Sequence, residues 1–219
     1  MLNSRKRHRD ARREKRPSQV LLEPALPKLV GACLVMGGAV YHPGNVSPLA
    51  EANFAHDARA AKLVVDAFST PDGDLLTIAP LDVTMRAMVS NADMQNLGTG
   101  VAETLLAQAW AAYSNNYCRV LKFCGDHGAL HDVHPVTYLL WPELYNKSEV
   151  APVDILLAPG NGAANGHSLV DRRKLAKAAT TIVDDRTGEA TSVRPPAATV
   201  LLDVDGGEFW RRFAKAVQA

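Results

Sequence analysis

The sequence has little of what disulfide-rich and membrane proteins need. Its 219 residues include three cysteines, Cys33, Cys118 and Cys124, an odd number without Cys-x-x-Cys spacing. This argues against a disulfide framework and favours a reducing compartment, so we expect a cytoplasmic protein. No apolar run approaches the roughly 18 residues of a membrane span. The first twenty residues also lack the apolar centre of a secretory signal, so we expect no membrane or secretory segment.

Basic residues are scarce outside the amino-terminal segment. Residues 1–17 hold eight of the 24 Lys and Arg and two of the 23 Asp and Glu, so the remainder is mildly acidic. A nucleic-acid partner is therefore not expected for the body of the chain. We expect residues 1–20 to be a disordered basic arm and residues 21–219 to form one domain. Such an arm is also typical of nuclear-import segments, which leaves a nuclear location as the alternative.

Strand-like and helix-like segments alternate along the body. Amphipathic patterns predict a helix after Asp57, a helix opening at 81, a long helix over roughly 100–123 and a carboxyl-terminal helix. Short apolar runs predict strands at 32–37, 74–80, 152–159, 179–185 and 198–205. This alternation predicts an α/β fold with a mostly parallel sheet flanked by helices.

Polar side chains concentrate in two loops, where such a fold places its ligands. In open α/β sheets, ligands bind outside the carboxyl ends of the strands. The loop at 38–53 contains Asn45, Glu51 and Asn53 in an otherwise small and apolar stretch. The loop at 124–135 contains a second group, made of His127, His131, Asp132 and His134.

Each group has a functional and a structural interpretation. Zinc needs three or four ligands at fixed spacing, which the Gly- and Pro-containing second loop does not offer, whereas the Asp132 carboxylate suits a hard cation. Alternatively, Asp132 caps a helix beginning near Pro135. Glu51 and Asn53 likewise fit a polar helix start. Two further residues, Asp82 and Thr84, are expected to serve as turn and cap.

Three separated motifs carry a family resemblance. The segments "MGGAVYHPGNVSPLAEANFAHDARAAKLVVDA", "LTIAPLDVT" and "LHDVHPVTYLLWPELY" occur in that order. In wording and spacing they resemble the inosine–uridine-preferring nucleoside hydrolases. The resemblance covers about 20–145 and, more loosely, 180–219. It lapses over 150–178, which includes "PGNGAANGHS", expected to be a flexible surface loop.

The resemblance implies hydrolysis of the N-ribosidic bond of purine and pyrimidine ribonucleosides, in a homo-oligomer. It assigns Asn45, Glu51 and Asn53 to the ribose hydroxyls, which both donate and accept hydrogen bonds. It assigns His131 as the acid beside the leaving base and Asp132 as a ligand of Ca²⁺. The water that attacks the sugar would be bound to that calcium and deprotonated by a carboxylate.

The chain departs from the family in its first twenty residues. The family opens with a strand and an aspartate-rich "DTDxGxDD" motif, which supplies the general base and most calcium ligands, and then has a "GPLTN" segment. Neither occurs here. We therefore expect a nucleoside hydrolase-like fold truncated at its amino terminus. The alternative function is an inactive remnant, or a nucleoside-binding module without the general base.

Overall fold

The computed structural model describes residues 23–113, 127–173, 180–183 and 190–219. The expected basic arm at 1–20, Cys118 and Cys124 lie outside these residues. The first part contains α3 (Leu26–Leu29), β1 (Cys33–Met36), α4 (Ala52–His56), α5 (Ala58–Phe68), β2 (Leu76–Ala79), α6 (Leu81–Thr84), β3 (Met88–Ser90), α7 (Asn91–Gln95) and α8 (Val101–Tyr113). The second part contains β4 (His127–Ala129), α10 (Val133–Leu140), the 3-10 helix η2 (Pro142–Leu144), β5 (Lys147–Ala151), β6 (Val153–Ile155), β7 (Ser168–Val170), β8 (Thr180–Val183), β9 (Ala190–Val193), β10 (Ala198–Asp203) and α11 (Gly206–Val217).

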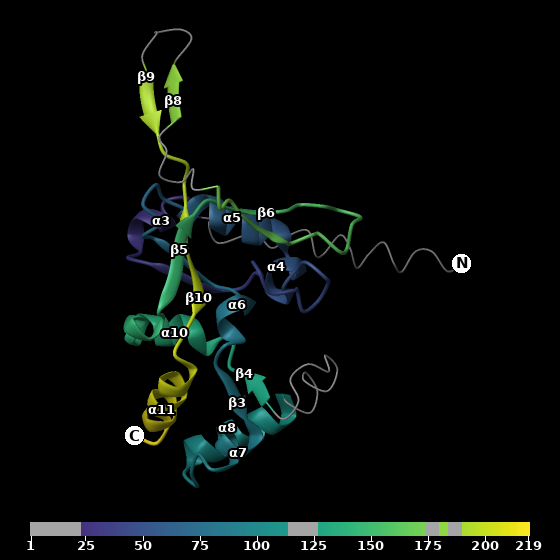
Figure 1. Ribbon diagram of the computed structural model, residues 1–219, viewed down its shortest axis with the longest axis vertical. Helices are drawn as coiled ribbons and strands as arrows, with labels where there is room; N and C mark the ends of the chain where they lie inside the picture. Colours follow the sequence, from purple (N-terminus) through teal and green to yellow (C-terminus); the bar gives the residue numbers. More distant parts are fainter. Residues whose placement is uncertain (1–22, 114–126, 174–179, 184–189) are drawn as a thin grey trace, which may run out of the picture.

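A four-stranded sheet forms the centre of the molecule (Figure 1). Its strand order is β1-β2-β10-β5, with β1, β2 and β10 parallel and β5 antiparallel at the edge. The register places Val35 beside Ile78 and Ile78 beside Val200. The predicted α/β fold with a mostly parallel sheet is therefore confirmed, and the carboxyl ends of three strands point the same way.

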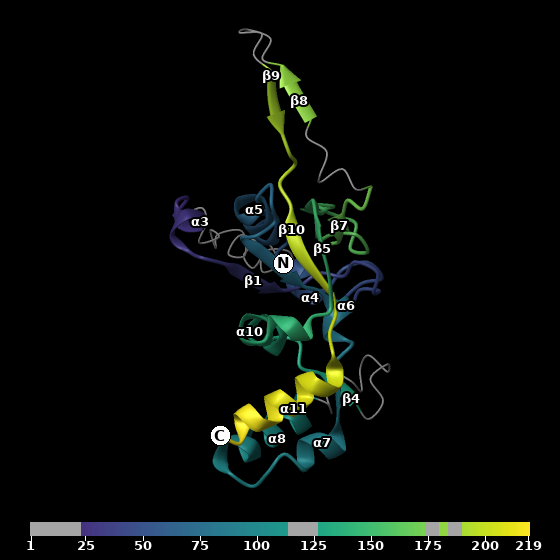
Figure 2. The same cartoon turned by 60° about the vertical axis from the view of Figure 1, so that its left-hand side comes forward.

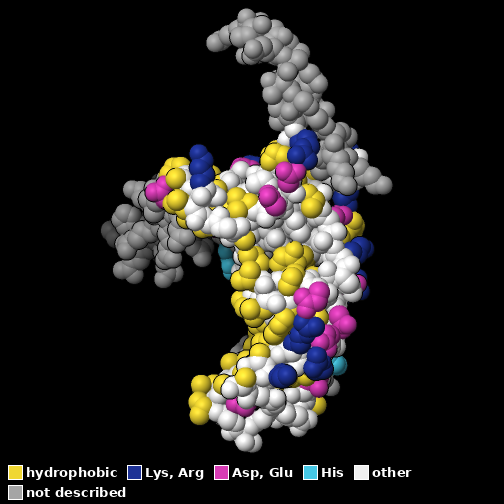
Figure 3. Space-filling model, turned by 90° about the vertical axis from the view of Figure 1, so that its left-hand side faces the viewer, with side chains coloured by type: hydrophobic (Ala, Val, Ile, Leu, Met, Phe, Trp, Pro, Cys, Tyr) yellow, Lys and Arg dark blue, Asp and Glu magenta, His cyan; other side chains and the backbone are white. Residues whose placement is uncertain are grey.

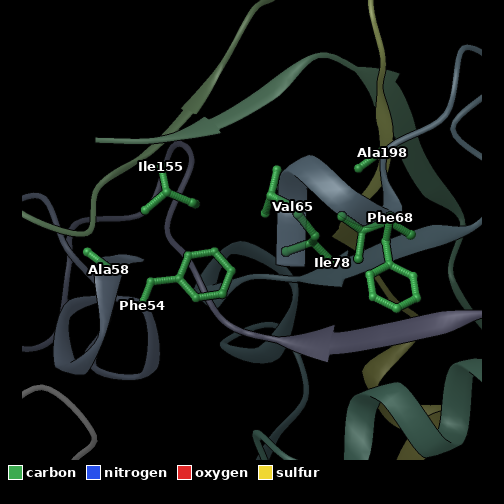
Figure 4. Close-up of a cluster of buried hydrophobic side chains, with 8 residues drawn as sticks. Phe54, Ala58, Val65, Phe68, Ile78, Ile155 and Ala198 are labelled. Atoms are coloured by element: carbon green, nitrogen blue, oxygen red, sulfur yellow. The ribbon is translucent and has the colours of Figure 1, made fainter. Parts of the chain in front are cut away.

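Helices cover both faces of this sheet, with α5 on one side and α10 on the other (Figure 2). Successive strand residues point to opposite faces, so each strand contributes to two cores. Ile78 of β2 packs with Val65 and Phe68 of α5 (Figure 4). The next residue, Ala79, belongs to the other cluster, which contains Phe209.

Two strands predicted for the sheet lie outside it. The run at 152–159 becomes β6, which pairs antiparallel with β7, and the run at 179–185 becomes β8, which pairs antiparallel with β9. The β8–β9 hairpin projects from the body (Figures 1 and 2). The edge position goes instead to β5, which the sequence interpretation missed. An apolar run predicts a strand but not its partner, and this is why the pairing was wrong.

Two predicted helices have different bounds from those expected. The helix opening at 81 is the single turn α6, and the β-prone residues that follow at 88–90 form β3. The long helix begins near its predicted start as α8 and is described as far as Tyr113. The remainder of its predicted range, 114–123, lies outside the described residues.

A third apolar cluster joins β3, α7, α8 and α11 below the sheet (Figure 1). Trp110 of α8 packs there against Val89 and Met94, and its indole N–H donates to Asn91 Oδ1 at 2.8 Å. The predicted carboxyl-terminal helix is confirmed as α11, which Asp205 caps through Glu208 N. This cluster fixes β4, and through β4 the segment that leads to His131.

Exposed apolar side chains gather on the face that contains α10 (Figure 3). Val136, Leu139 and Leu140 of this helix are each more than half exposed. None of the helices within the described residues combines the length and the apolar character that a bilayer crossing demands.

The central position of Ile78 makes a stability prediction. Ile78→Val removes one methylene from a side chain that is 2% exposed. We expect the free energy of unfolding to fall by about 1 kcal/mol. The exposed edge substitution Val150→Ala should cost less than about 0.5 kcal/mol. Urea unfolding of both variants measures this, and equal costs would contradict the assigned core.

Candidate functional site

The Glu51 carboxylate holds together the two ends of the loop that follows β1. Its Oε2 accepts hydrogen bonds from Gly38 N at 3.0 Å and Phe54 N at 3.2 Å, and its Oε1 accepts from Asn53 N at 2.8 Å. Gly38 adopts a φ of 86°, a conformation that favours glycine. Glu51 is 2% exposed and is the N-cap of α4, so the predicted polar helix start is confirmed.

These three bonds limit what else Glu51 can bind. A carboxylate offers about four lone-pair sites, so roughly one acceptor site remains after three backbone N–H groups are satisfied. One further donor, such as a hydroxyl of a sugar, fits that capacity. Glu51 is therefore first a structural anchor, with room for a single further hydrogen bond.

Both predicted asparagines lie beside this carboxylate. Asn45 Oδ1 accepts from Ala52 N at 2.9 Å, next to the Glu51 peptide. Asn53 Nδ2 reaches back to the carboxyl end of β1, where it lies 3.3 Å from Met36 O and 3.1 Å from Met36 Sδ. The structure thus brings Asn45, Glu51 and Asn53 together, and we call these three residues the amide–carboxylate cluster.

Asp82 of α6 organises the turn that follows the glycines. Its Oδ1 accepts from Tyr41 N at 2.6 Å and His42 N at 3.0 Å, and its Oδ2 accepts from Val40 N at 2.8 Å. The side chain is mostly buried. Asp82 was expected to be a local turn residue, but it binds backbone about 40 positions earlier in the chain. The sequence carries no signal for this, because the partners are backbone groups of any residue type.

Thr84, which lies in α6 with Asp82, contacts His131, the residue predicted to act as the acid. Thr84 Oγ1 lies 2.7 Å from His131 Nδ1, and Thr84 is fully buried. Burial lowers the pKa of His131 to about 4, while Asp132 opposes and His42 reinforces that lowering. His131 is therefore a neutral imidazole near pH 7. Thr84 was likewise expected to be a cap, and its cross-chain contact was missed.

Hydrogen bonds connect the amide–carboxylate cluster to His131 through α6. Gly38 donates its N–H to Glu51, and its carbonyl oxygen accepts from Leu81 N at 2.9 Å. Leu81 begins α6, and Thr84 at the other end of α6 contacts His131. The two loops singled out in the sequence therefore meet across one short helix at the carboxyl ends of β1 and β2.

The Gly- and Asn-rich segment at 156–168 packs over the first loop. Ser47 Oγ donates to Ala163 O at 2.9 Å, and His167 Nδ1 lies 2.8 Å from Leu49 O. A Cβ on Gly166 would lie 2.6 Å from Ala55 Cα, so only glycine fits that approach. Residues 159–163 are exposed, as expected of a surface loop, and the segment also contacts the 44–50 stretch through backbone and side chains.

Ser168, at the end of this segment, fixes the peptide after the glycines. Its Oγ donates to Ala39 O at 2.7 Å and accepts from Ala39 N at 3.0 Å. Ser168 is 4% exposed, and Ala39 is buried. Both backbone polar groups of one buried residue thus depend on a single hydroxyl that lies 129 residues away in the chain.

The other predicted histidines do not join the site. His134 is fully buried, bonds Tyr145 Oη at 3.0 Å and stacks on Phe209 at 4.6 Å. Burial lowers its pKa to about 3, so it is a neutral core residue. His127 lies in β4, paired with Ser90. Of the second group, only His131 and Asp132 stay as candidates.

Asp132 occupies the N-cap position of α10 but makes no capping hydrogen bond with its side chain. Asp132 is therefore at the N-cap, as the alternative predicted, but its side chain does not make the hydrogen bond of a cap. Within the described residues no three His, Cys, Asp or Glu side chains form a group that could hold a metal ion. One carboxylate is too few for Ca²⁺, which takes six to eight oxygen ligands.

Comparison with known proteins places this arrangement in context. A family model described as "Inosine-uridine preferring nucleoside hydrolase" matches residues 19–211. A Leishmania major protein of that name is 34% identical over 158 residues, which are 70% of this chain and 46% of that protein. The pyrimidine-specific ribonucleoside hydrolase RihA of Enterobacter sp. (strain 638) is 34% identical over 56% of this chain and 37% of its own length.

Solved structures share the fold. A plant nucleoside hydrolase, PpNRh1, superposes with a TM-score of 0.73 at 22% identity, covering 91% of this chain and 57% of that chain. A purine-preferring ribonucleoside hydrolase from Gardnerella vaginalis has a TM-score of 0.65 at 21% identity, over 90% and 55% respectively. The chain spans about half the length of the relatives and structures that it matches.

The Glu51 anchor predicts a cost for removing its charge. Glu51→Gln keeps the size but leaves one oxygen to serve three N–H groups, so we expect a loss of about 2 kcal/mol in unfolding free energy. Asp57→Asn is the matched control, because Asp57 is exposed and caps α5 through one bond to Ala60 N. Since Asn caps as well as Asp, its cost should stay below about 0.5 kcal/mol. Urea unfolding distinguishes them, and similar costs would refute the anchor.

The Ser168 contact predicts a local effect. Ser168→Ala leaves the buried N–H and carbonyl of Ala39 without their partner, so we expect a loss of about 2 kcal/mol and faster amide exchange at Ala39. Ser47→Ala, which removes one contact of the same segment, should cost about 1 kcal/mol or less. Unchanged exchange at Ala39 in the Ser168 variant would show that the hydroxyl does not hold this peptide.

Proposed function

The chain belongs to the inosine-uridine preferring nucleoside hydrolase family, and we propose that it binds ribonucleosides and takes part in hydrolysing their N-ribosidic bond. The relatives carry the names of nucleoside and ribonucleoside hydrolases. Because the chain covers less than half of each of these two proteins, the activity is proposed from the site and not transferred from them. A reducing, cytoplasmic setting suits the odd number of cysteines.

One observation carries the proposal, namely the hydrogen-bonded connection from the amide–carboxylate cluster through α6 to His131. It joins Glu51 to Gly38, Gly38 to Leu81, and Thr84 to His131. Groups suited to a sugar and a group suited to its leaving base are thereby held on one rigid frame. Such preorganisation is what orients a bound substrate for bond cleavage.

We assign the sugar to the amide–carboxylate cluster. Asn45 and Asn53 carry amides that both donate and accept, and Glu51 retains about one acceptor site, which together suit ribose hydroxyls. Cleavage of the N-ribosidic bond leaves positive charge on the sugar, as in glycoside hydrolysis. The buried Glu51 carboxylate lies where it would favour such charge.

We assign the leaving base to His131. We assign the tautomer in which the Thr84 hydroxyl donates to Nδ1 and the imidazole hydrogen lies on Nε2, from which it is donated to a nitrogen or oxygen of the base. A neutral imidazole acts here as a hydrogen-bond donor, in keeping with its lowered pKa. Negative charge developing on the departing base would strengthen that bond.

Calcium chemistry does not follow from the described residues. Asp132 is an exposed carboxylate that we propose as one oxygen ligand, but the described residues around it do not complete a set. The other ligands and the group that deprotonates the attacking water would come from outside them.

A ribose titration and a turnover assay test the proposal on the full chain. We expect Asn53→Ala to weaken ribose binding about tenfold, because it removes a hydrogen-bonding amide from the amide–carboxylate cluster. His131→Ala should leave ribose affinity within about threefold but lower inosine and uridine turnover about a hundredfold. Calorimetry measures the first effect and detection of released base the second.

Asn96→Ala is the control, since Asn96 is an exposed amide at the end of α7. Equal losses in the Asn53 and Asn96 variants would contradict the sugar assignment. A folded chain that binds ribonucleosides without turnover would contradict hydrolysis and leave a binding module.

A further inference from the structure

The backbone of the turn at 40–42 is held by a buried carboxylate. Three successive backbone N–H groups converge on the Asp82 carboxylate at 2.6 to 3.0 Å. Asp82 belongs to α6, which lies beside the carboxyl end of β2 and contacts β10 (Figure 1). This arrangement fixes the position of every side chain that leaves the turn, including that of His42.

The His42 ring is itself oriented. His42 Nδ1 lies 2.7 Å from Pro43 O. A carbonyl oxygen only accepts, so Nδ1 carries the hydrogen and donates it. In the neutral imidazole, Nε2 is then a bare acceptor. Backbone and ring are both held, so the acceptor has a defined direction.

His42 is connected to both assigned halves of the site. Along the chain it precedes Asn45 by three residues. Its backbone is bound by Asp82, and Thr84 of the same helical turn binds His131. The His42 imidazole is also close enough to His131 to contribute to its lowered pKa, after burial.

The neighbouring aromatic residue is occupied elsewhere. The Arg172 guanidinium lies over the Tyr41 ring, 3.6 Å from its centroid, and Arg172 also pairs with Glu149 at 3.5 Å. One face of Tyr41 is therefore taken by a cation. The Tyr41 hydroxyl can both donate and accept, whereas the His42 ring is oriented with its acceptor nitrogen free of the Pro43 contact, and an acceptor is the group that a ring N–H of a nucleobase needs.

We propose that His42 is a specificity-determining residue that accepts a hydrogen bond from a ring N–H of the nucleobase, and that Asp82 is the residue that positions it. This inference rests on the proposed function. Hypoxanthine and uracil both present a ring N–H beside a carbonyl group, although one is a purine and the other a pyrimidine. Adenine and cytosine have an acceptor nitrogen at the equivalent place. His42 therefore selects bases with a ring N–H over those without one.

Paired ligands test this on the full chain. Inosine is compared with 1-methylinosine, and uridine with 3-methyluridine, because each methyl group replaces the ring hydrogen. We expect the wild-type chain to prefer the unmethylated member about tenfold, and His42→Ala to reduce that preference to about twofold or less. Ribose affinity should stay within about threefold. Calorimetry gives the affinities, and ratios of kcat/KM replace them where a nucleoside is turned over.

Asp82→Asn tests the positioning step. It should reduce the same preference and raise amide exchange at residues 40–42, with ribose affinity within about threefold. Loss of stability alone would not change a ratio between two ligands. His56→Ala and Asp57→Asn are the matched controls, since both residues are exposed and lie where α4 meets α5. Both controls should keep the wild-type preference.

Several outcomes would overturn the inference. An unchanged preference in His42→Ala would show that the ring does not contact the base. Equal losses of ribose and inosine affinity would make His42 part of the sugar support instead. A collapsed preference in His42→Ala but not in Asp82→Asn would remove Asp82 from the proposal. A wild-type chain that binds neither ribose nor inosine would overturn the proposed function and this inference with it.

Discussion

The candidate site depends on one buried carboxylate and the three backbone N–H groups that it accepts. Glu51 ties Gly38, at the end of β1, to the first turn of α4, and so sets the shape of the whole intervening loop. A carboxylate is stable at 2% exposure only when its charge is matched by donors of this kind. The hydrogen bonds that stabilise the buried Glu51 carboxylate therefore also determine how many of its acceptor sites remain for a ligand.

The second constraint is the single helical turn α6. Asp82 and Thr84 extend from it to two segments, one about 40 residues earlier and the other 47 residues later. A one-turn helix has little stability of its own, so the contacts on both sides hold it as much as it holds them. The segments on both sides of the candidate site are thus attached to the same short helix.

Sequence patterns predicted the parts of this molecule that local physics decides. The parallel strands β1, β2 and β10 and the helices α5 and α11 follow from apolar periodicity and caps such as Asp57, and the structure has them. The partners of β6 and β8 could not be predicted, because strand pairing is not a local property. Asp82, Thr84 and Ser168 were missed for the same reason, since each acts on a distant segment through backbone or ring atoms that leave no motif.

Binding and bond cleavage place different demands on these residues. The described part of the chain supplies amides, the buried Glu51 carboxylate and a neutral imidazole, to which the proposed function assigns the sugar and the leaving base. Activation of water needs a base or a cation, and among the described residues no three His, Cys, Asp or Glu side chains form a group that could hold a metal ion. In the proposed function, recognition therefore belongs to the frame formed by β1, β2 and α6, and its specificity can be measured separately from turnover.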